Sequence, residues 1–169
     1  MGPLHTYSAT VTWTGAGTAG TASYTSYSRN HEVLLPDKPV LLGTSDPAFR
    51  GEPDRYTPEE LFVTSLSQCH MLWFLHLASA EGITVTGYVD KATGRMRIES
   101  QGAGQFVDVT LRPRVTLASP RTREGALVTD ELVAQVHEKA HQHCFIARSV
   151  NFPVHIDPVP LDRVAVLQD

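Results

Sequence analysis

The sequence predicts an α+β domain in which antiparallel β-sheet packs on helices. Three features support this fold class. Runs with alternating apolar and polar residues lie near both ends of the chain, a long apolar run with helix signals occupies the middle, and a second helical pattern precedes a last short strand. The chain has 169 residues, of which 41% are hydrophobic, which suffices for one core but not for two independent ones. We expect a single domain over residues 1–169.

Charge and composition narrow the function classes. The 18 acidic and 14 basic side chains give a formal net charge of −4. A chain without a broad cationic surface is a poor ligand for phosphate backbones, so nucleic acid is not an expected partner. No basic segment followed by an apolar run and a cleavage site opens the sequence, so we expect a cytoplasmic protein.

The first third of the chain predicts a hairpin followed by a loop. Residues 6–14 alternate as a strand, residues 15–20 are rich in glycine, and residues 22–35 favour a second strand. The segment 36–58 contains five prolines and should be irregular. Loops of this length in a small domain are usually functional.

A strong helix start follows the loop. Thr57 can cap the helix, Pro58 suits its first position, and Glu60 can close a capping box three residues after the cap. We expect this helix to run to about Ala80 and to stop at Gly82. The helix is apolar on nearly every side, although its polar residues argue against a membrane span, so protein should cover it on several sides.

The second half predicts more strands and one more helix. Residues 83–90, 95–100 and 106–117 alternate as strands and predict a three-stranded meander. Thr129 can cap a second helix that ends near His143, and residues 150–156 suggest a final strand. We expect all of these strands to pair in antiparallel sheet.

Two cysteines, Cys69 and Cys144, are too few for a disulfide framework of the secreted kind. They are either buried fillers or reactive groups. A reactive thiol needs a cation that stabilises its thiolate, and a disulfide product needs a partner thiol. Arg29, Arg50 and Arg55 all precede the helix that contains Cys69. Each alone is more typical of a solvated surface charge.

A different pattern suggests metal chemistry. His137, Glu138 and His141 form the sequence H-E-x-x-H on the second predicted helix, which is the spacing of a zinc hydrolase. The motif lies near the end of its helix and lacks the longer metalloprotease continuation. A third ligand could come only from His143, Cys144 or His155.

Two histidines beside Cys69 could activate it as a nucleophile on esters or amides. His70, however, points about 100° around the helix from Cys69 and cannot easily pair with the thiol. We expect His70 and His76 to be core or interface histidines instead.

Three segments together resemble the OsmC/Ohr family, whose members are thiol peroxidases. They are Thr57-Pro58-Glu59-Glu60-Leu61, Ser65-Leu66-Ser67-Gln68-Cys69-His70 and Cys144-Phe145-Ile146-Ala147-Arg148-Ser149. The resemblance covers about residues 6–157 and leaves 158–169 as a C-terminal tail. It implies an OsmC-like fold, in which antiparallel sheets wrap around two central helices in an intertwined homodimer with active sites at the subunit interface.

The resemblance also implies roles for single residues. Cys69 would be the peroxidatic cysteine and Cys144 the resolving one, while Glu59 would hold an arginine against the thiolate. Family branches supply this arginine from different segments, which here suggests Arg29 in the hairpin or Arg50 in the loop. Arg50 lies nineteen residues before Cys69, and this spacing slightly favours it.

The implied reaction reduces organic hydroperoxides to alcohols through a Cys69 sulfenic acid and a Cys69–Cys144 disulfide. An external dithiol, for example one of the lipoyl type, would reduce the disulfide, and no bound cofactor, metal, nucleic acid or membrane is required. Apolar side chains would receive the substrate, namely Phe62, Leu66, Trp73 or Phe145.

The sequence departs from well-known members in two places, the long segment 33–54 and the Cys144-Phe145 pair, where a proline often follows the cysteine. These departures bear on substrate preference and rate. The expected function is therefore an organic hydroperoxide peroxidase. Two alternatives stay open: a zinc-binding hydrolase that uses residues 137–141, or a noncatalytic dimeric module that binds a small apolar ligand.

Overall fold

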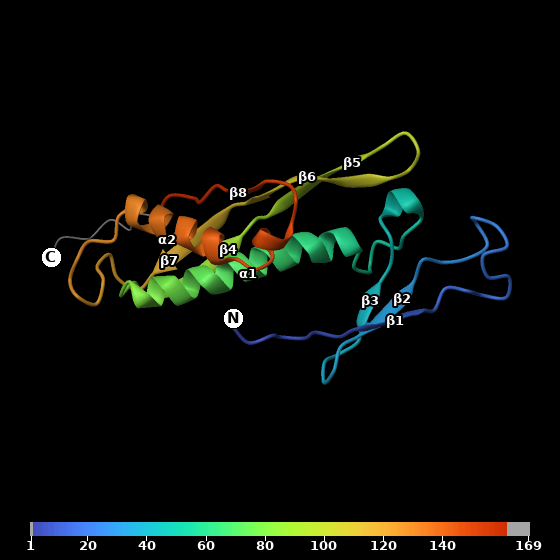
Figure 1. Cartoon of the computed structure of the whole chain (residues 1–169), viewed down its shortest axis with the longest axis horizontal. Coiled ribbons are helices and arrows are strands. Elements are labelled where there is room, and N and C mark those ends of the chain that lie inside the picture. The colour runs from blue at the N-terminus through green and yellow to red at the C-terminus, as the bar shows by residue number, and fades with distance from the viewer. Residues whose placement is uncertain (1, 162–169) are drawn as a thin grey trace. The chain divides into compact units, whose positions relative to one another are not determined.

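The computed structural model describes residues 2–161 of the chain (Figure 1). The element order is β1–β2–β3–η1–α1–β4–β5–β6–β7–α2–η2–β8, where η denotes a 3₁₀ helix, so the predicted α+β class is confirmed. By its contacts the chain divides into two compact units, Met1–Phe62 and Val63–Asp169. Residues 162–169, which make up most of the predicted tail, lie outside the described residues.

The first unit contains a three-stranded antiparallel sheet in the order β1–β2–β3. Strand β1 (Thr10–Trp13) pairs with β2 (His31–Leu34) so that Trp13 faces His31, which confirms the predicted hairpin. The second strand begins later than predicted. Residues 15–30 form a loop instead, held together internally by bonds such as the one that Ser26 Oγ donates to the Gly20 carbonyl at 2.7 Å.

The proline-rich segment is more ordered than its composition predicts. It contains β3 (Leu41–Gly43), which pairs with β2, and the 3₁₀ helix η1 (Pro47–Phe49), capped by Asp46. A strand of three residues is too short to leave a periodic signal in the sequence. Gly43 lies so close to the ring of His31 that a Cβ there would meet Nε2 at 2.2 Å.

The long helix α1 (Pro58–Ala80) begins and ends as predicted. Its capping box is formed: the Glu60 amide donates to Thr57 Oγ1 at 3.2 Å, and the Thr57 amide donates to Glu60 Oε2 at 2.9 Å. Gly82 ends the helix in the left-handed conformation at a φ of 72°.

Only one stripe of α1 is fully buried in the described chain. Its members recur every fourth residue, namely Leu66, His70, Phe74 and Ala78. Leu72, by contrast, is 62% exposed. The single chain therefore does not cover the helix on several sides as expected. By length and composition alone α1 could also cross a membrane, a test that core helices pass as well.

The second unit contains two small sheets instead of the predicted meander. Strand β4 (Val85–Asp90) pairs with β7 (Pro113–Leu117), and β5 (Thr93–Ile98) pairs with β6 (Gly104–Leu111). The prediction of a three-stranded meander is wrong because the predicted strand 106–117 divides at Arg112. Its first part forms β6, which pairs with β5, and its second part forms β7, which pairs with β4. Asp90 fixes this point by accepting a hydrogen bond from the Arg112 amide at 2.6 Å.

The last strand, β8 (Val154–Ile156), runs parallel to β6, so the expectation of purely antiparallel sheet was wrong. The chain between them contains α2 (Asp130–His143), which is long enough to return it to the same end of the sheet. Thr129 caps α2 as predicted, since its Oγ1 accepts from the Leu132 amide at 3.2 Å.

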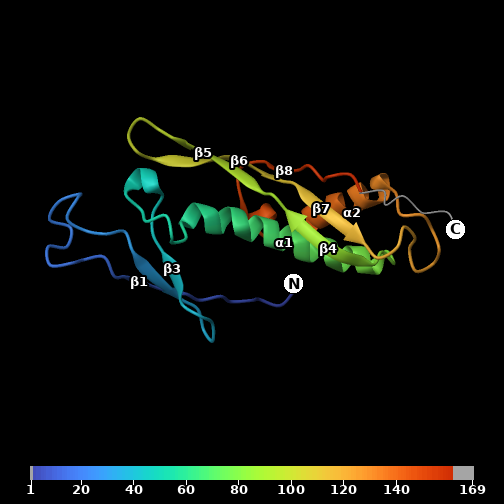
Figure 2. The same cartoon turned by 180° about the vertical axis from the view of Figure 1, so that it is seen from behind.

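The core lies where α1, α2 and the sheets of the second unit meet. Helices α1 and α2 lie side by side, seen from both directions (Figures 1 and 2). One cluster of buried side chains lies at this junction, namely Phe74, Ala78, Ile83, Val115, Val128, Val133, Val136 and Ala140. A second cluster joins Leu66 to Val109 and Leu111 of β6.

Candidate active site

The two cysteines meet at the junction of α1 and α2. Cys69 lies in the middle of α1 and is half-buried, while Cys144 caps the C-terminal end of α2 and is 1% exposed. Both are free thiols, and they are close enough for Cys69 to raise the pKa of the Cys144 thiol. Two thiols 75 positions apart are thus brought together by the packing of two helices.

The surroundings of the two thiols differ. Burial raises the pKa of the Cys144 thiol to about 11; the backbone amide of Ala147, 3.5 Å from the sulfur, opposes the shift, and the neighbouring Cys69 adds to it. The C-terminal end of a helix also disfavours negative charge. Cys144 is therefore protonated at neutral pH, while Cys69 is the more accessible of the two thiols.

Aromatic side chains lie next to the cysteine pair. Trp73, one turn after Cys69, makes an edge-on contact with Phe145 at 5.5 Å between ring centroids and a tilted contact with His143 at 5.0 Å. Phe145 is 66% exposed. Leu66, a predicted substrate contact, is instead fully buried in the core. The aromatic patch of Trp73, His143 and Phe145 is the apolar surface available beside the thiols.

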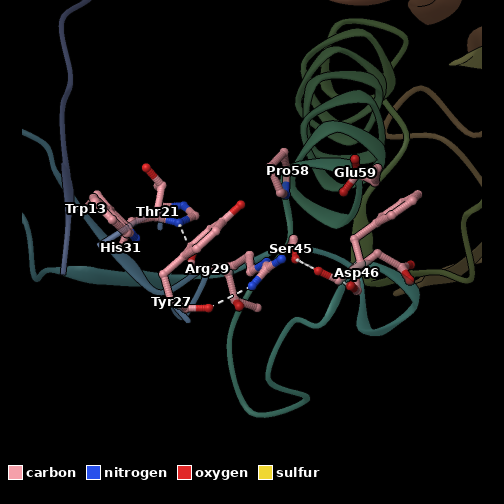
Figure 3. Close-up of a pocket in the computed structure, with 11 residues that line it drawn as sticks. Trp13, Thr21, Tyr27, Arg29, His31, Ser45, Asp46, Pro58 and Glu59 are labelled. Carbon is pink, nitrogen blue, oxygen red and sulfur yellow. Dashed lines mark hydrogen bonds between the residues drawn. The ribbon is translucent and has the colours of Figure 1, made fainter. Parts of the chain in front are cut away.

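The other predicted site residues line a pocket in the first unit. This pocket has a volume of about 440 Å³ and contains both Arg29 and Glu59 (Figure 3). Its full lining is Trp13, Thr21, Tyr27, Arg29, His31, Thr44, Ser45, Asp46, Phe49, Pro58 and Glu59. Glu59 stands in the first turn of α1, and its buried Oε2 has no hydrogen-bond partner among the described residues. This carboxylate oxygen can therefore accept a hydrogen bond from a donor on another molecule.

Arg29 is held rigidly in this pocket. Its Nη1 donates to the Tyr27 carbonyl at 2.7 Å and its Nη2 to the Tyr24 carbonyl at 2.9 Å. The guanidinium also lies over both tyrosine rings, 4.3 Å and 4.2 Å from their centroids. These contacts fix the cation, and within residues 2–161 its charge has no carboxylate partner.

Arg50 and Arg55 lie elsewhere in the first unit. Arg50 follows η1 with a φ of 70°, is exposed, and is not among the residues that line the pocket with Glu59. Arg55 makes a 3.7 Å ion pair with Glu52, and its buried Nη1 has no partner in the described part of the chain. Of the three arginines singled out in the sequence, Arg29 is the one that shares a pocket with Glu59.

The H-E-x-x-H motif does not converge on one point. His137 is buried and its Nδ1 lies 3.0 Å from Nε2 of His70 on α1. Glu138 is exposed and accepts a hydrogen bond from Gln142 at 2.9 Å. Within residues 2–161 no three histidine, cysteine or acidic side chains are grouped as a metal site would require. The motif is part of an α1–α2 contact.

Sequence reasoning missed two features of these regions. The first is the tyrosine clamp on Arg29, for which the spacing of Tyr24, Tyr27 and Arg29 was the only signal. The second is the pairing of His70 with His137. Leu66, His70 and Phe74 lie four residues apart, and this spacing predicts a core position for His70. No local pattern, however, points to its partner His137, 67 residues away.

Comparison with known proteins identifies the family. The OsmC-like protein family model matches residues 51–158, which include both cysteines and Glu59. The chain belongs to the OsmC family. Among proteins with curated functional descriptions none matches the chain.

Solved structures of OsmC-like proteins share the fold. An OsmC-like protein of unknown function from Vibrio cholerae is 31% identical over 92% of this chain and 100% of its own, with a TM-score of 0.81. An organic hydroperoxide resistance protein from Elizabethkingia anophelis is 20% identical over 94% and 96% of the two chains, with a TM-score of 0.66. A Legionella pneumophila organic hydroperoxide resistance protein, 16% identical over 93% and 97%, has the same TM-score.

Proposed function

We propose that this OsmC-family protein is a thiol-dependent peroxidase that reduces organic hydroperoxides to alcohols. The observation that supports this most directly is the cysteine pair: a half-buried Cys69 next to a buried, protonated Cys144. This is the arrangement that a peroxide-reactive thiol and its resolving partner need. The resemblance in fold to organic hydroperoxide resistance proteins agrees with it.

In the first step the Cys69 thiolate attacks the terminal oxygen of the hydroperoxide. An S–O bond forms, the O–O bond breaks, and the alkoxide leaves as an alcohol after taking up a proton from solvent. Cys69 is oxidised to a sulfenic acid and the peroxide is reduced. The aromatic patch beside the thiol suits a substrate with an apolar alkyl or aryl group.

In the second step the Cys144 sulfur attacks the sulfenic sulfur of Cys69. The S–S bond forms, the S–O bond breaks, and the hydroxide leaves with the Cys144 proton as water. An external dithiol then reduces the disulfide by two exchanges and is itself oxidised; we propose a lipoyl-type dithiol. Because Cys144 is protonated, it must lose its proton as its sulfur attacks, and this proton is the one that leaves with the hydroxide as water.

We assign thiolate stabilisation to Arg29 with Glu59, not to Arg50. Arg29 is fixed in a pocket with Glu59, whereas Arg50 is exposed. Glu59 precedes Cys69 by ten residues on one helix, which is about 15 Å along the axis, so its carboxylate does not contact that thiol. The pocket would then act on the Cys69 of a second copy, across a homodimer interface.

Exposed apolar side chains support this homodimer. In the described single chain Leu72 and Phe145 near the thiols and Val11 and Leu42 on the first sheet are between 44% and 66% exposed. Soluble monomers rarely leave many large apolar side chains in water, and a symmetric dimer buries the same surface on both copies. A second copy would also complete the cover that α1 lacks.

The activity is tested by following cumene hydroperoxide in the presence of a dithiol, dihydrolipoamide or dithiothreitol, with hydrogen peroxide as the comparison substrate. We expect turnover by the wild type, none by Cys69→Ser, and a single sulfenic acid per chain in Cys144→Ser. The matched control is Thr64→Ala, at an exposed position on the same helix. Full activity of Cys69→Ser would overturn the proposal.

The shared site is tested by co-expressing two tagged chains and purifying the mixed dimer. One chain carries Cys69→Ser and the other Glu59→Gln. If each site combines residues of both copies, the mixed dimer holds one intact site and one doubly defective site, and we expect about half of wild-type activity. If each chain builds its own site, both sites are defective and the activity stays at the level of the single variants.

A further inference from the structure

A second pair of side chains joins the same two helices. His70 on α1 and His137 on α2 are 1% and 2% exposed, and Nε2 of His70 lies 3.0 Å from Nδ1 of His137. The two rings are nearly parallel, and Phe74 stacks on His137 with 4.0 Å between the ring centroids. Two buried, packed rings joined by a hydrogen bond form a stiff bridge between α1 and α2.

Stability alone does not explain this bridge. A neutral imidazole has one N–H and one lone pair, and the shared bond uses one of each. His70 Nδ1 and His137 Nε2 are buried without a partner in the described residues. Whichever tautomers form, one N–H donor is thus left unpaired, at the cost of a buried unsatisfied group. An apolar pair would avoid this cost, so the bridge calls for a functional explanation.

The bridge is neutral at ordinary pH. Burial lowers the pKa of His70 to about 4, with His141 adding to the shift, and lowers that of His137 to about 3, with His70 adding to it. The other titratable group packed here is Tyr88 of β4, whose pKa burial raises, with Asp90 adding to the shift. No charge therefore disturbs the imidazole contact near pH 7.

The bridge lies next to the cysteine pair along both helices. His70 directly follows Cys69, and His137 lies seven positions, or two helical turns, before Cys144. Disulfide formation needs the two free sulfurs to approach to a covalent bond of about 2.05 Å, with restricted separations of the two Cα atoms. The spacing of α1 and α2 at this level therefore governs whether the sulfurs can join.

We propose that the His70–His137 bridge is a positioning pair that sets the spacing of α1 and α2 at which Cys69 and Cys144 form their disulfide. The proposal deepens the proposed peroxidase function and rests on it for its biological role. The bridge itself exchanges no electrons or protons with the substrate; it acts through the two cysteines, whose step yields the S–S bond and water as written above. The hydrogen bond, and not only the volume of the rings, is what holds the spacing.

The proposal is tested by two matched double variants of the full chain. His70→Leu with His137→Phe fills the space but removes the bond. His70→Gln with His137→Asn places an amide near each of the two bonding nitrogens and can restore it. His76→Gln, an exposed histidine on the same helix, is the control. If the apolar double variant fails to fold, His70→Leu alone takes its place against His70→Gln.

The readout is the equilibrium of the reduced protein with a dithiothreitol redox buffer, which gives the effective concentration of Cys69 and Cys144 toward each other. We expect the apolar pair to lower it on the order of tenfold or more, as small misplacements of reacting groups do. We expect the Gln/Asn pair to recover most of it. The unfolding midpoint of the apolar pair should be no lower than that of the wild type, since the unpaired donor is gone.

The same variants are then treated with one equivalent of cumene hydroperoxide. A longer-lived sulfenic acid in the apolar pair, in step with its lower effective concentration, is the expected result. Equal effective concentrations in all variants, or an equal loss in the Gln/Asn and apolar pairs, would overturn the positioning role. If the wild type ignores peroxide but the dithiothreitol equilibrium changes as expected, the peroxidase proposal fails and the positioning role stands.

Discussion

The two units of the chain differ in what holds them together. In the described residues every buried hydrophobic side chain lies at or beyond Leu66, in the unit Val63–Asp169. The unit Met1–Phe62 buries polar residues such as Thr44 and Thr57, and its strand residues Val11 and Leu42 stay exposed. This unit is held together by hydrogen bonds, including those that Arg29 donates within its tyrosine clamp.

This difference matches a division of chemical roles. The thiols belong to the unit with a packed core, where a disulfide step needs a fixed geometry. Arg29 and Glu59 belong to the other unit, which has a pocket but few buried apolar side chains. A small apolar core stabilises a unit weakly, so the first unit would gain most from the proposed contact with a second copy.

The largest expected effect is on the free energy of unfolding and concerns the packed core of the unit Val63–Asp169. Phe74 is 0% exposed and contacts His137, so Phe74→Ala should lower the free energy of unfolding by about 3–5 kcal/mol. Leu4→Ala, at a residue 94% exposed in the other unit, should change it by less than about 0.5 kcal/mol. Urea unfolding measures both. Equal effects would remove the contrast between the units.

The next largest effect is on the rate of sulfenic acid formation and concerns the pocket in the unit Met1–Phe62. Arg29→Met should slow sulfenic acid formation on the order of 100-fold, because the thiolate loses its cation. Arg50→Met, which removes an exposed arginine outside the pocket, should leave the rate within about twofold. Stopped-flow mixing with cumene hydroperoxide gives both rates. The opposite ranking would transfer the role to Arg50.

Acid should weaken the core unit through its histidine bridge. Because folding lowers the pKa of His70 and His137, the unfolded chain binds these protons first. Their contribution to stability is complete above about pH 6.5 and is lost as the pH falls toward about 4 for His70 and about 3 for His137, by up to about 1.4 kcal/mol per pH unit for each histidine.

The check on this acid effect is the difference in unfolding free energy between the wild type and the His70→Leu, His137→Phe variant across that range. Carboxylates titrate in both proteins, so the difference isolates the two histidines. Parallel curves would mean that the bridge does not stay neutral when the chain folds.

The smallest effect concerns the helix start that links the two units. Thr57→Ala removes the acceptor for the Glu60 amide and should cost about 1 kcal/mol. Thr57→Ser keeps the hydroxyl and should cost less than half as much. Thermal unfolding of the two variants measures the difference, and equal losses would show that the methyl group of Thr57, not its hydroxyl, stabilises the start of α1.

The sequence predicts what local signals determine. The capping box and the stop of α1 follow from Thr57 and Gly82, the N-cap of α2 follows from Thr129, and the structure has all three where expected. The pairing of strands is a nonlocal choice. The division of one predicted strand at Arg112 and the parallel return of β8 depend on which surfaces remain to be covered, which no short window records.

The candidate site follows the same rule. The motifs around Cys69 and Cys144 suggest two cysteines in one site, but their contact arises from the packing of α1 on α2. The sequence spacing to Cys69 favoured Arg50, whereas the pocket with Glu59 is lined by Arg29. The loop between β1 and β2 holds Arg29 there by packing its guanidinium over the rings of Tyr24 and Tyr27. The His70–His137 bridge likewise joins residues that share no local pattern.

The central claim is that Cys69 and Cys144 react with a hydroperoxide as a pair. The most direct measurement is the intact mass and the number of free thiols of the reduced protein before and after one equivalent of cumene hydroperoxide. The account predicts that the wild type loses both thiols and two hydrogen atoms, and that Cys144→Ser gains one oxygen at Cys69. An unchanged mass and two remaining thiols would contradict it.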